Sequence, residues 1–251
     1  MQHKAYLVLD DGAIFEGTSW AARGETFGEA VFSTGMTGYQ ETLTDPSYHK
    51  QVVIMTAPHI GNTGMNHFDE ESKKVWVSGF VVRNPSPIVS NWRSERSLEE
   101  VLFDSGVIGI QGVDTRAITR HLRDRGAMRV GIFSGSEITR QEMVNKVRSF
   151  ASMSGAYLAE DVSTSEIRVI PAIGAKRFTV AAFDLGIKAA TPRNMSERGI
   201  EVHLLPVNTP LESILKGDFD GLFLSNGPGD PAAMTDLVTL VRGALDAQDR
   251  K

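Results

Sequence analysis

Short apolar runs separated by turn residues recur through the first 135 residues, a pattern typical of β-strands. Strands are expected over residues 5–9, 13–17, 29–33, 51–57, 76–83, 107–113 and 128–134. Helices are expected over residues 97–104, 114–125 and 139–150. Ser97 and Asp114 can cap the first two helices, and Gly126 can end the second. This mixture predicts an α+β N-terminal domain that is β-rich with a few helices.

The pattern changes near residue 153. Ser, Gly, Ala and Glu dominate residues 153–176, which we expect to be a linker. Strands over 177–183, 201–207 and 222–224 then alternate with helices over 191–198, 211–216 and 231–247. This alternation predicts a parallel, doubly wound α/β unit. Three strands are few for such a fold, so we expect domains over residues 1–152 and 177–251, the second of them incomplete.

Composition narrows the classes of function. The 251 residues are 41% hydrophobic and 23% charged, with a net charge of −5, which argues against nucleic acid as the main partner. The sequence contains no cysteine, which excludes a disulfide framework, a thiolate metal site and a cysteine nucleophile within these residues. No apolar run reaches 18 residues, so we expect no membrane partner and a cytoplasmic location.

The turn at residues 225–231 is the strongest candidate site. Its sequence, S-N-G-P-G-D-P, lies where a predicted strand ends and a helix begins. Gly227 and Gly229 can adopt positive φ, and such a turn can direct backbone N–H groups at a ligand above the sheet. A helix-entry turn without a ligand explains the same spacing equally well.

Three other segments carry candidate chemistry. Residues 34–48 form a hydroxyl-rich loop in which Ser47 can present its hydroxyl, although a well-capped structural loop is the simpler interpretation. Histidines and carboxylates gather over residues 59–71, but their spacing fits no common metal loop, so we expect no metal site. The arginines around the 114–125 helix predict a solvated face or a docking surface for an acidic partner.

Several motifs together resemble one family. They lie at residues 33–41 (S-T-G-M-T-G-Y-Q-E), 43–48 (L-T-D-P-S-Y), 58–62 (P-H-I-G-N), 114–116 (D-T-R) and 224–231 (L-S-N-G-P-G-D-P). In this order they resemble the small, glutamine-hydrolysing subunit of carbamoyl-phosphate synthetase, along the whole chain. Residues 183–188 (F-D-L-G-I-K) are similar to the opening strand of that family's class I glutamine amidotransferase domain.

The resemblance implies a function. The small subunit of this family hydrolyses L-glutamine to glutamate and ammonia, and a large-subunit partner uses the ammonia with bicarbonate and ATP to make carbamoyl phosphate. Arginine and pyrimidine biosynthesis use that product. Ser47, Gly227 and Gly229 match the residues that bind glutamine, and the Gly227 N–H matches an oxyanion-hole donor. ATP, Mg and K are expected on the large subunit, and no cofactor or metal is expected in this chain.

The family nucleophile is a cysteine, followed by a histidine and a glutamate, and none of that region matches here. We therefore assign no catalytic residue and expect these 251 residues to be inactive alone. Two alternatives stay open. One is a non-catalytic docking module for the large subunit. The other is a different class I glutamine amidotransferase, such as the anthranilate or guanylate type, which leaves the first 150 residues unexplained.

Overall fold

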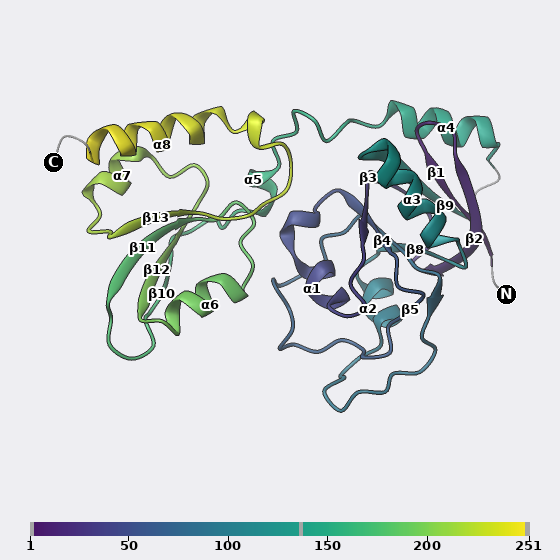
Figure 1. The fold of residues 1–251 in the computed structure, drawn as a ribbon, viewed down its shortest axis with the longest axis horizontal. Helices are drawn as coiled ribbons and strands as arrows, with labels where there is room; N and C mark the ends of the chain where they lie inside the picture. The colour runs from purple at the N-terminus through teal and green to yellow at the C-terminus, as the bar shows by residue number, and fades with distance from the viewer. Residues whose placement is uncertain (1–2, 136–137, 249–251) are drawn as a thin grey trace. The chain divides into compact units, whose positions relative to one another are not determined.

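The computed structural model describes residues 3–135 and 138–248. The chain forms two compact units, Met1–Ser152 and Met153–Lys251, each described by itself below. Both units mix helices with strands (Figure 1), in agreement with the predicted mixed character. Among the described residues, no helix combines the length and the apolar character needed to cross a membrane.

The first unit is built on a closed barrel. In spatial order its strands are β1 (Lys4–Leu9), β2 (Ile14–Ala21), β8 (Ile108–Gln111), β6 (Gly79–Val81), β4 (Gln51–Met55), β3 (Glu25–Ser33) and β9 (Met128–Ser134). The β3–β4, β4–β6 and β6–β8 pairs are parallel, and the others are antiparallel. Strand β9 closes the barrel because Ile132 lies opposite Leu7 of β1 on one side and Thr26 of β3 on the other. The strands were expected, but the closure was not.

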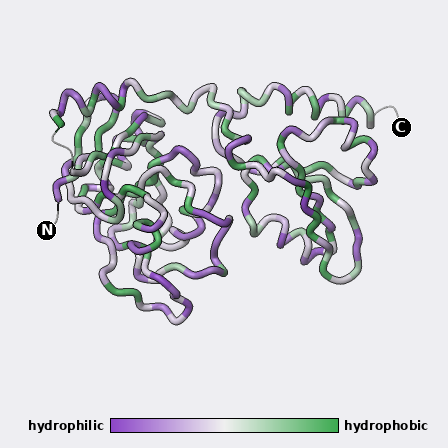
Figure 2. Tube along the Cα trace, turned by 180° about the vertical axis from the view of Figure 1, so that it is seen from behind, coloured by the Kyte–Doolittle hydropathy of each residue, from purple (hydrophilic) through white to green (hydrophobic). Residues whose placement is uncertain are grey.

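Alternation along the strands divides the core of this unit. Leu7 and Leu9 of β1 point into the barrel, whereas Val8 between them packs outside against Val147 of α4 (Arg140–Ser149). Successive side chains of a strand face opposite sides, so each barrel strand serves both an inner core and an outer layer. Figure 2 shows short hydrophobic segments, in green, interspersed with hydrophilic ones, in purple, along the trace.

Local caps set the helix ends of the first unit. Its helices are α1 (Tyr39–Thr44), η1 (Pro46–Tyr48), α2 (Leu98–Asp104), α3 (Thr115–Arg125) and α4, and a small sheet pairs β5 (His59–Ile60) with β7 (Asn84–Pro85). Ser97 caps α2 in a capping box with Glu100, and Asp114 caps α3 by accepting the Ala117 N–H at 3.0 Å. Gly126, with φ of 89°, ends α3. These three predictions are confirmed, whereas α1 and η1 lie where only a loop was expected.

The turn between β1 and β2 is held by charged groups. Asp11 lies 2.7 Å from Nε2 of His121 and 3.0 Å from Nη1 of Arg125, both on α3, and it accepts the Ala13 N–H at 3.0 Å. Asp10 pairs with Nε of Arg129 at 3.0 Å. Burial by itself would raise the pKa of Asp11, but the Ala13 N–H, His121 and Arg125 outweigh it and leave that pKa below its ordinary value of 3.8.

Asp11→Asn should therefore destabilise the first unit at neutral pH by about 1–2 kcal/mol. A carboxylate with a lowered folded pKa stabilises the fold above its unfolded pKa, and this contribution disappears as the pH falls through the folded pKa. The difference between wild type and variant should thus shrink as the pH falls from 7 to below 3. Urea unfolding at several pH values measures it. Asp124→Asn, which removes only an exposed pair with Arg123, is the control, and an equal effect of both variants would contradict this role.

The second unit is a four-stranded α/β sheet. Its spatial order is β10 (Arg168–Ile170), β12 (Ile200–Leu205), β11 (Phe178–Phe183) and β13 (Gly221–Leu224). The three last-named strands are parallel, as predicted, and β10 is antiparallel at one edge. Helix α6 (Ala190–Ser196) covers one face, while α7 (Leu211–Lys216) and α8 (Thr235–Gln248) cover the other (Figure 1).

Two stretches of this unit differ from expectation. Residues 153–176, expected as a linker, carry α5 (Ala159–Val162) and β10, because elements of three or four residues are too short to show a period. The last helix was expected from residue 231. Instead, Pro231 begins a short 3₁₀ helix, η2 (Pro231–Ala233), and α8 starts at Thr235.

Candidate functional site

The carboxyl ends of β11 and β13 lie side by side in the second unit. Strand β11 pairs with β12 on one side and with β13 on the other. The chain leaves β11 through α6 toward β12, and later returns through α7 to β13 on the opposite side. The connections thus diverge between β11 and β13, and open α/β sheets bind ligands in the crevice at this kind of position. The turn at residues 225–231 follows β13 directly at this position of the sheet.

Asp184 organises the loop that follows β11. Its side chain is only 4% exposed. One carboxylate oxygen accepts the N–H groups of Gly186 and Ile187 at 3.1 and 3.0 Å, and the other accepts the Thr164 N–H at 2.8 Å. A buried carboxylate with this many donors is well satisfied, so it fixes the backbone of the loop after β11.

Ser225 and Asn226 tie the loop after β13 to the loop after β11. The buried Ser225 hydroxyl accepts the Leu185 N–H at 2.9 Å and donates to the Asn226 carbonyl at 2.8 Å. The side-chain amide of Asn226 donates to the Gly186 carbonyl at 3.0 Å. Hydrogen bonds therefore hold the two strand-end loops to each other.

Gly227, in the loop after β13, presents a backbone N–H as a hydrogen-bond donor. The residue is half-buried, and its N–H donates to no acceptor in the part of the chain that the structure describes. Because the flanking loops are anchored, this N–H has a fixed direction. A fixed donor without a partner can stabilise a developing negative charge without having to reorganise.

The packing of the loops explains why both predicted glycines are glycine. A Cβ on Gly227 would lie 1.8 Å from the Leu185 carbonyl oxygen, and a Cβ on Gly229 would lie 2.5 Å from that of Ala156. Gly229 has φ of 89°, as expected, whereas Gly227 is outside the positive-φ region, contrary to expectation. The close approach that demands Gly227 is thus to a neighbouring loop of the same unit.

Asp230 completes the turn. One of its oxygens accepts the Gly155 N–H at 2.8 Å and the other accepts the Ala232 N–H at 2.9 Å. These two hydrogen bonds lower the pKa of Asp230. The turn is therefore anchored at its far end to the start of the second unit.

Ser47 belongs to the first unit, whereas Gly227 and Gly229 belong to the second. It lies in η1, where the side chain of Asp45, which is 2% exposed, accepts the Ser47 N–H at 2.9 Å. Asp45 thus acts as the cap of η1, and the loop expected over residues 34–48 is a short helix followed by a capped turn.

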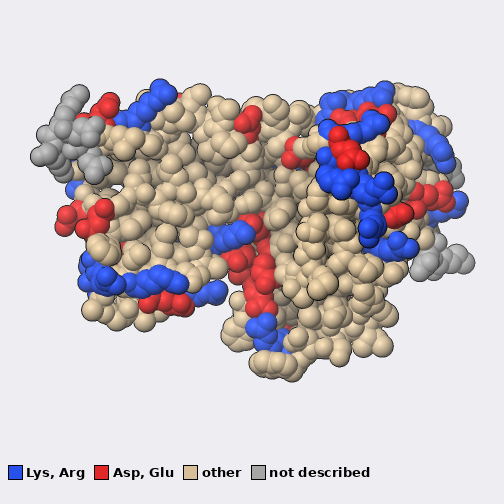
Figure 3. Space-filling model, viewed as in Figure 1, with Lys and Arg blue, Asp and Glu red and all other residues tan. Residues whose placement is uncertain are grey.

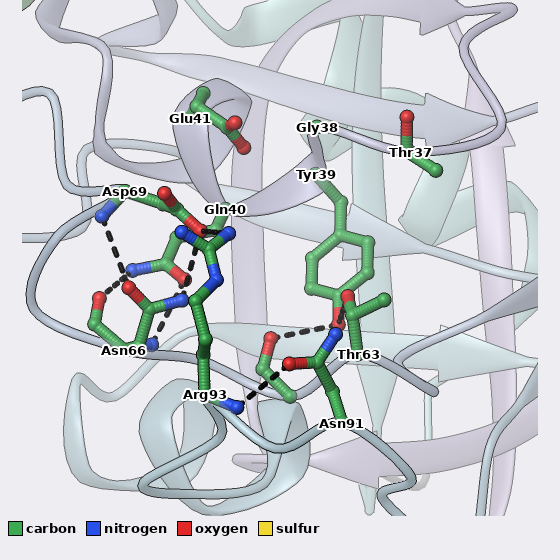
Figure 4. A pocket seen from close by; sticks show the side chains of 11 residues that line it. Thr37, Gly38, Tyr39, Gln40, Glu41, Thr63, Asn66, Asp69, Asn91 and Arg93 are labelled. Carbon is green, nitrogen blue, oxygen red and sulfur yellow. Dashed lines mark hydrogen bonds and ion pairs between the residues drawn. The ribbon is translucent and has the colours of Figure 1, made fainter.

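A polar cavity of about 270 Å³ lies beside α1, which precedes η1. Figure 4 shows Arg93 reaching to Asp69, at 2.7 Å, and the Tyr39 hydroxyl beside Thr63, at 2.8 Å. Tyr39 also donates to a backbone carbonyl, and burial raises its pKa, so the hydroxyl keeps its proton. Among the described residues no buried side-chain polar atom lacks a hydrogen-bond partner, and Tyr39 joins α1 to residues 63 and 64.

The two remaining candidate segments are the histidines and carboxylates of residues 59–71 and the arginines around α3. In the described ranges, no group of three or more His, Asp or Glu side chains is placed to hold a metal ion. His67 pairs with Glu95 instead. Figure 3 shows positive and negative groups mixed over α3. Arg125 and Arg129 pair with the β1–β2 turn, while Arg116 is exposed.

The comparisons with known proteins match both units. The family model for the carbamoyl-phosphate synthase small chain, CPSase domain, matches residues 7–132. The family model for glutamine amidotransferase class-I matches residues 181–249. Carbamoyl phosphate synthase small chains of Streptomyces coelicolor and Streptomyces avermitilis are 60% and 62% identical over 243 and 242 residues, respectively. Each alignment covers 96% of this chain and 64% of the relative. The small chain of Mycolicibacterium paratuberculosis is 55% identical over 250 residues, covering 98% of this chain and 67% of the relative.

Proposed function

The chain belongs to the family of carbamoyl phosphate synthase small chains, and from this we propose that the complete protein hydrolyses glutamine for a carbamoyl phosphate synthase. The match over residues 7–132 accounts for the first unit, which an anthranilate- or guanylate-type amidotransferase would leave unexplained. The chain spans 64% of the length of the two Streptomyces relatives, so activity, substrate and partner are proposed for the complete protein.

In the proposed reaction, glutamine is cleaved to glutamate and ammonia. The ammonia passes to a large subunit, which combines it with bicarbonate at the expense of ATP. That subunit would hold the ATP, Mg and K, and the product would serve arginine and pyrimidine biosynthesis. The family resemblance supports this division of labour.

The Gly227 N–H is the observation that carries the proposal. It is a fixed donor without an acceptor among the described residues, at the point of the sheet where α/β folds bind ligands. Attack on the side-chain amide of glutamine places negative charge on its oxygen, and we propose that this N–H stabilises that charge. Gly229 would line the same crevice, and Ser47 would donate a hydrogen bond to the bound substrate.

The sequence contains no cysteine, so we propose that the attacking thiolate of the family mechanism comes from elsewhere in the complete protein. The residues described here would then bind and orient glutamine and stabilise the oxyanion. The test is ammonia release from glutamine by the complete protein. Absence of release, with the protein folded and its partner present, would favour the alternative of a docking module without chemistry.

Ser47→Ala in the complete protein should raise KM for glutamine about fivefold, because it removes one hydrogen bond worth about 1 kcal/mol. Steady-state glutaminase kinetics measure the change. Ser149→Ala is the control, since among the described residues its exposed hydroxyl bonds only the Lys146 carbonyl within α4, and KM should stay the same. An unaltered KM in Ser47→Ala would remove Ser47 from the substrate site.

A further inference from the structure

One hydroxyl group controls the direction of the Gly227 N–H. The carbonyl of Asn226 and the N–H of Gly227 belong to the same peptide group, which is planar and trans, so the two bonds point in opposite directions. The Ser225 hydroxyl donates to that carbonyl at 2.8 Å. Fixing the carbonyl on one side of the peptide therefore fixes the N–H on the other.

The Ser225 hydroxyl is itself held. It accepts the Leu185 N–H at 2.9 Å, and because the hydroxyl has one proton, this leaves that proton to the Asn226 carbonyl. The side chain is 9% exposed, so water competes weakly for these bonds. A relay thus runs from the loop after β11, through Ser225, to the peptide that carries the donor.

A second anchor acts on the same peptide. The Asn226 side chain donates to the Gly186 carbonyl at 3.0 Å, which limits rotation of residue 226 about its backbone. Gly186 is placed in turn by Asp184. The relay through Ser225 acts on the peptide directly, whereas Asn226 acts through its own side chain.

We infer that Ser225 is a positioning residue for glutamine hydrolysis, orienting the Gly227 N–H toward the oxygen that becomes negatively charged. This inference rests on the proposed function. It adds a residue that touches no substrate atom and acts only through the peptide group. Misalignment of an oxyanion donor weakens binding of the transition state more than binding of the substrate, so its loss should lower kcat and leave KM nearly unchanged.

The test is Ser225→Ala in the complete protein with its partner. We expect kcat per folded molecule to fall about tenfold, less than the 10²–10³ typical of removing a donor outright, with KM within about twofold of wild type. Ser225→Thr keeps the hydroxyl and should recover most of kcat. Ser196→Ala is the matched control, since this buried hydroxyl also donates to a carbonyl, that of Pro171 at 2.6 Å, and its loss should leave kcat unchanged.

Asn226→Ala removes the second anchor and keeps the relay, so kcat should fall about threefold. Ser225→Cys keeps the size of the side chain but donates only a weak hydrogen bond, and it decides the matter if Ser225→Ala does not fold. A wild-type kcat in folded Ser225→Ala, or in Ser225→Cys when only that variant folds, would overturn the inference alone. A wild-type protein that releases no ammonia from glutamine would overturn the proposed function and the inference with it.

Discussion

Gly227→Ala is expected to destabilise the second unit by at least about 3 kcal/mol. The new Cβ would lie 1.8 Å from the oxygen and 2.7 Å from the carbon of the Leu185 carbonyl. Both are backbone atoms, and the Leu185 backbone is held by Ser225 and by the adjoining Asp184 loop. The clash cannot be relieved by turning a side chain, so one of the two loops has to move.

Hydrogen–deuterium exchange of β11 peptides measures this loss within the second unit. Gly221→Ala is the matched control because the nearest atom to its new Cβ is a Val180 methyl at 3.9 Å. The control should leave protection of β11 nearly unchanged. Equal protection in Gly227→Ala and wild type would show that the loops accommodate a side chain, and would contradict the rigid packing of the two loops.

Asp184→Ala should cost about 3 kcal/mol or more. The substitution leaves the N–H groups of Gly186, Ile187 and Thr164 without their carboxylate, in a site that water reaches poorly. Each buried donor left without a partner costs about 1–3 kcal/mol. The loop after β11 should then lose its fixed shape.

Denaturant unfolding followed by circular dichroism measures the effect. Asp220→Ala is the control, since this exposed carboxylate accepts a single described N–H, that of Thr179 at 2.7 Å. Its cost should be about 1 kcal/mol or less. Asp184→Asn keeps acceptor oxygen at the site and should fall between the two. A loss in Asp184→Ala no larger than in Asp220→Ala would contradict the role of Asp184.

The elements that the sequence predicted well are those with local signals. Ser97, Asp114 and Gly126 sit next to the helices they cap or end, so their effect depends on neighbouring residues alone. The closed barrel has no such signal. It depends on Ile132 meeting both Leu7 and Thr26, which lie far away along the chain, and strand periodicity does not say which strands pair.

The residues of the candidate site also differ in how clearly the local sequence marks them. Gly227 and Gly229 stand out in the sequence because two glycines and two prolines crowd one turn after a strand. The roles of Asp184 and Ser225 do not show in the sequence, because each also binds an N–H group from a distant segment, Thr164 about 20 and Leu185 about 40 residues away. The one signal that the sequence offers for Asp184 is its place as an acidic residue directly after the apolar strand predicted over residues 177–183. The packing reason for Gly227 was also hidden, since the Leu185 carbonyl approaches from another loop.

Barrel closure through β9 governs when the first unit can fold during synthesis. Strands β1 and β3 both pair with residues 128–134, so the native barrel cannot close before this segment is available. The N-terminal strands must therefore wait, with their apolar faces open, until this segment has left the ribosome. A nascent chain arrested just before Met128 should bind chaperones, and one extended past Ser152 should resist proteases.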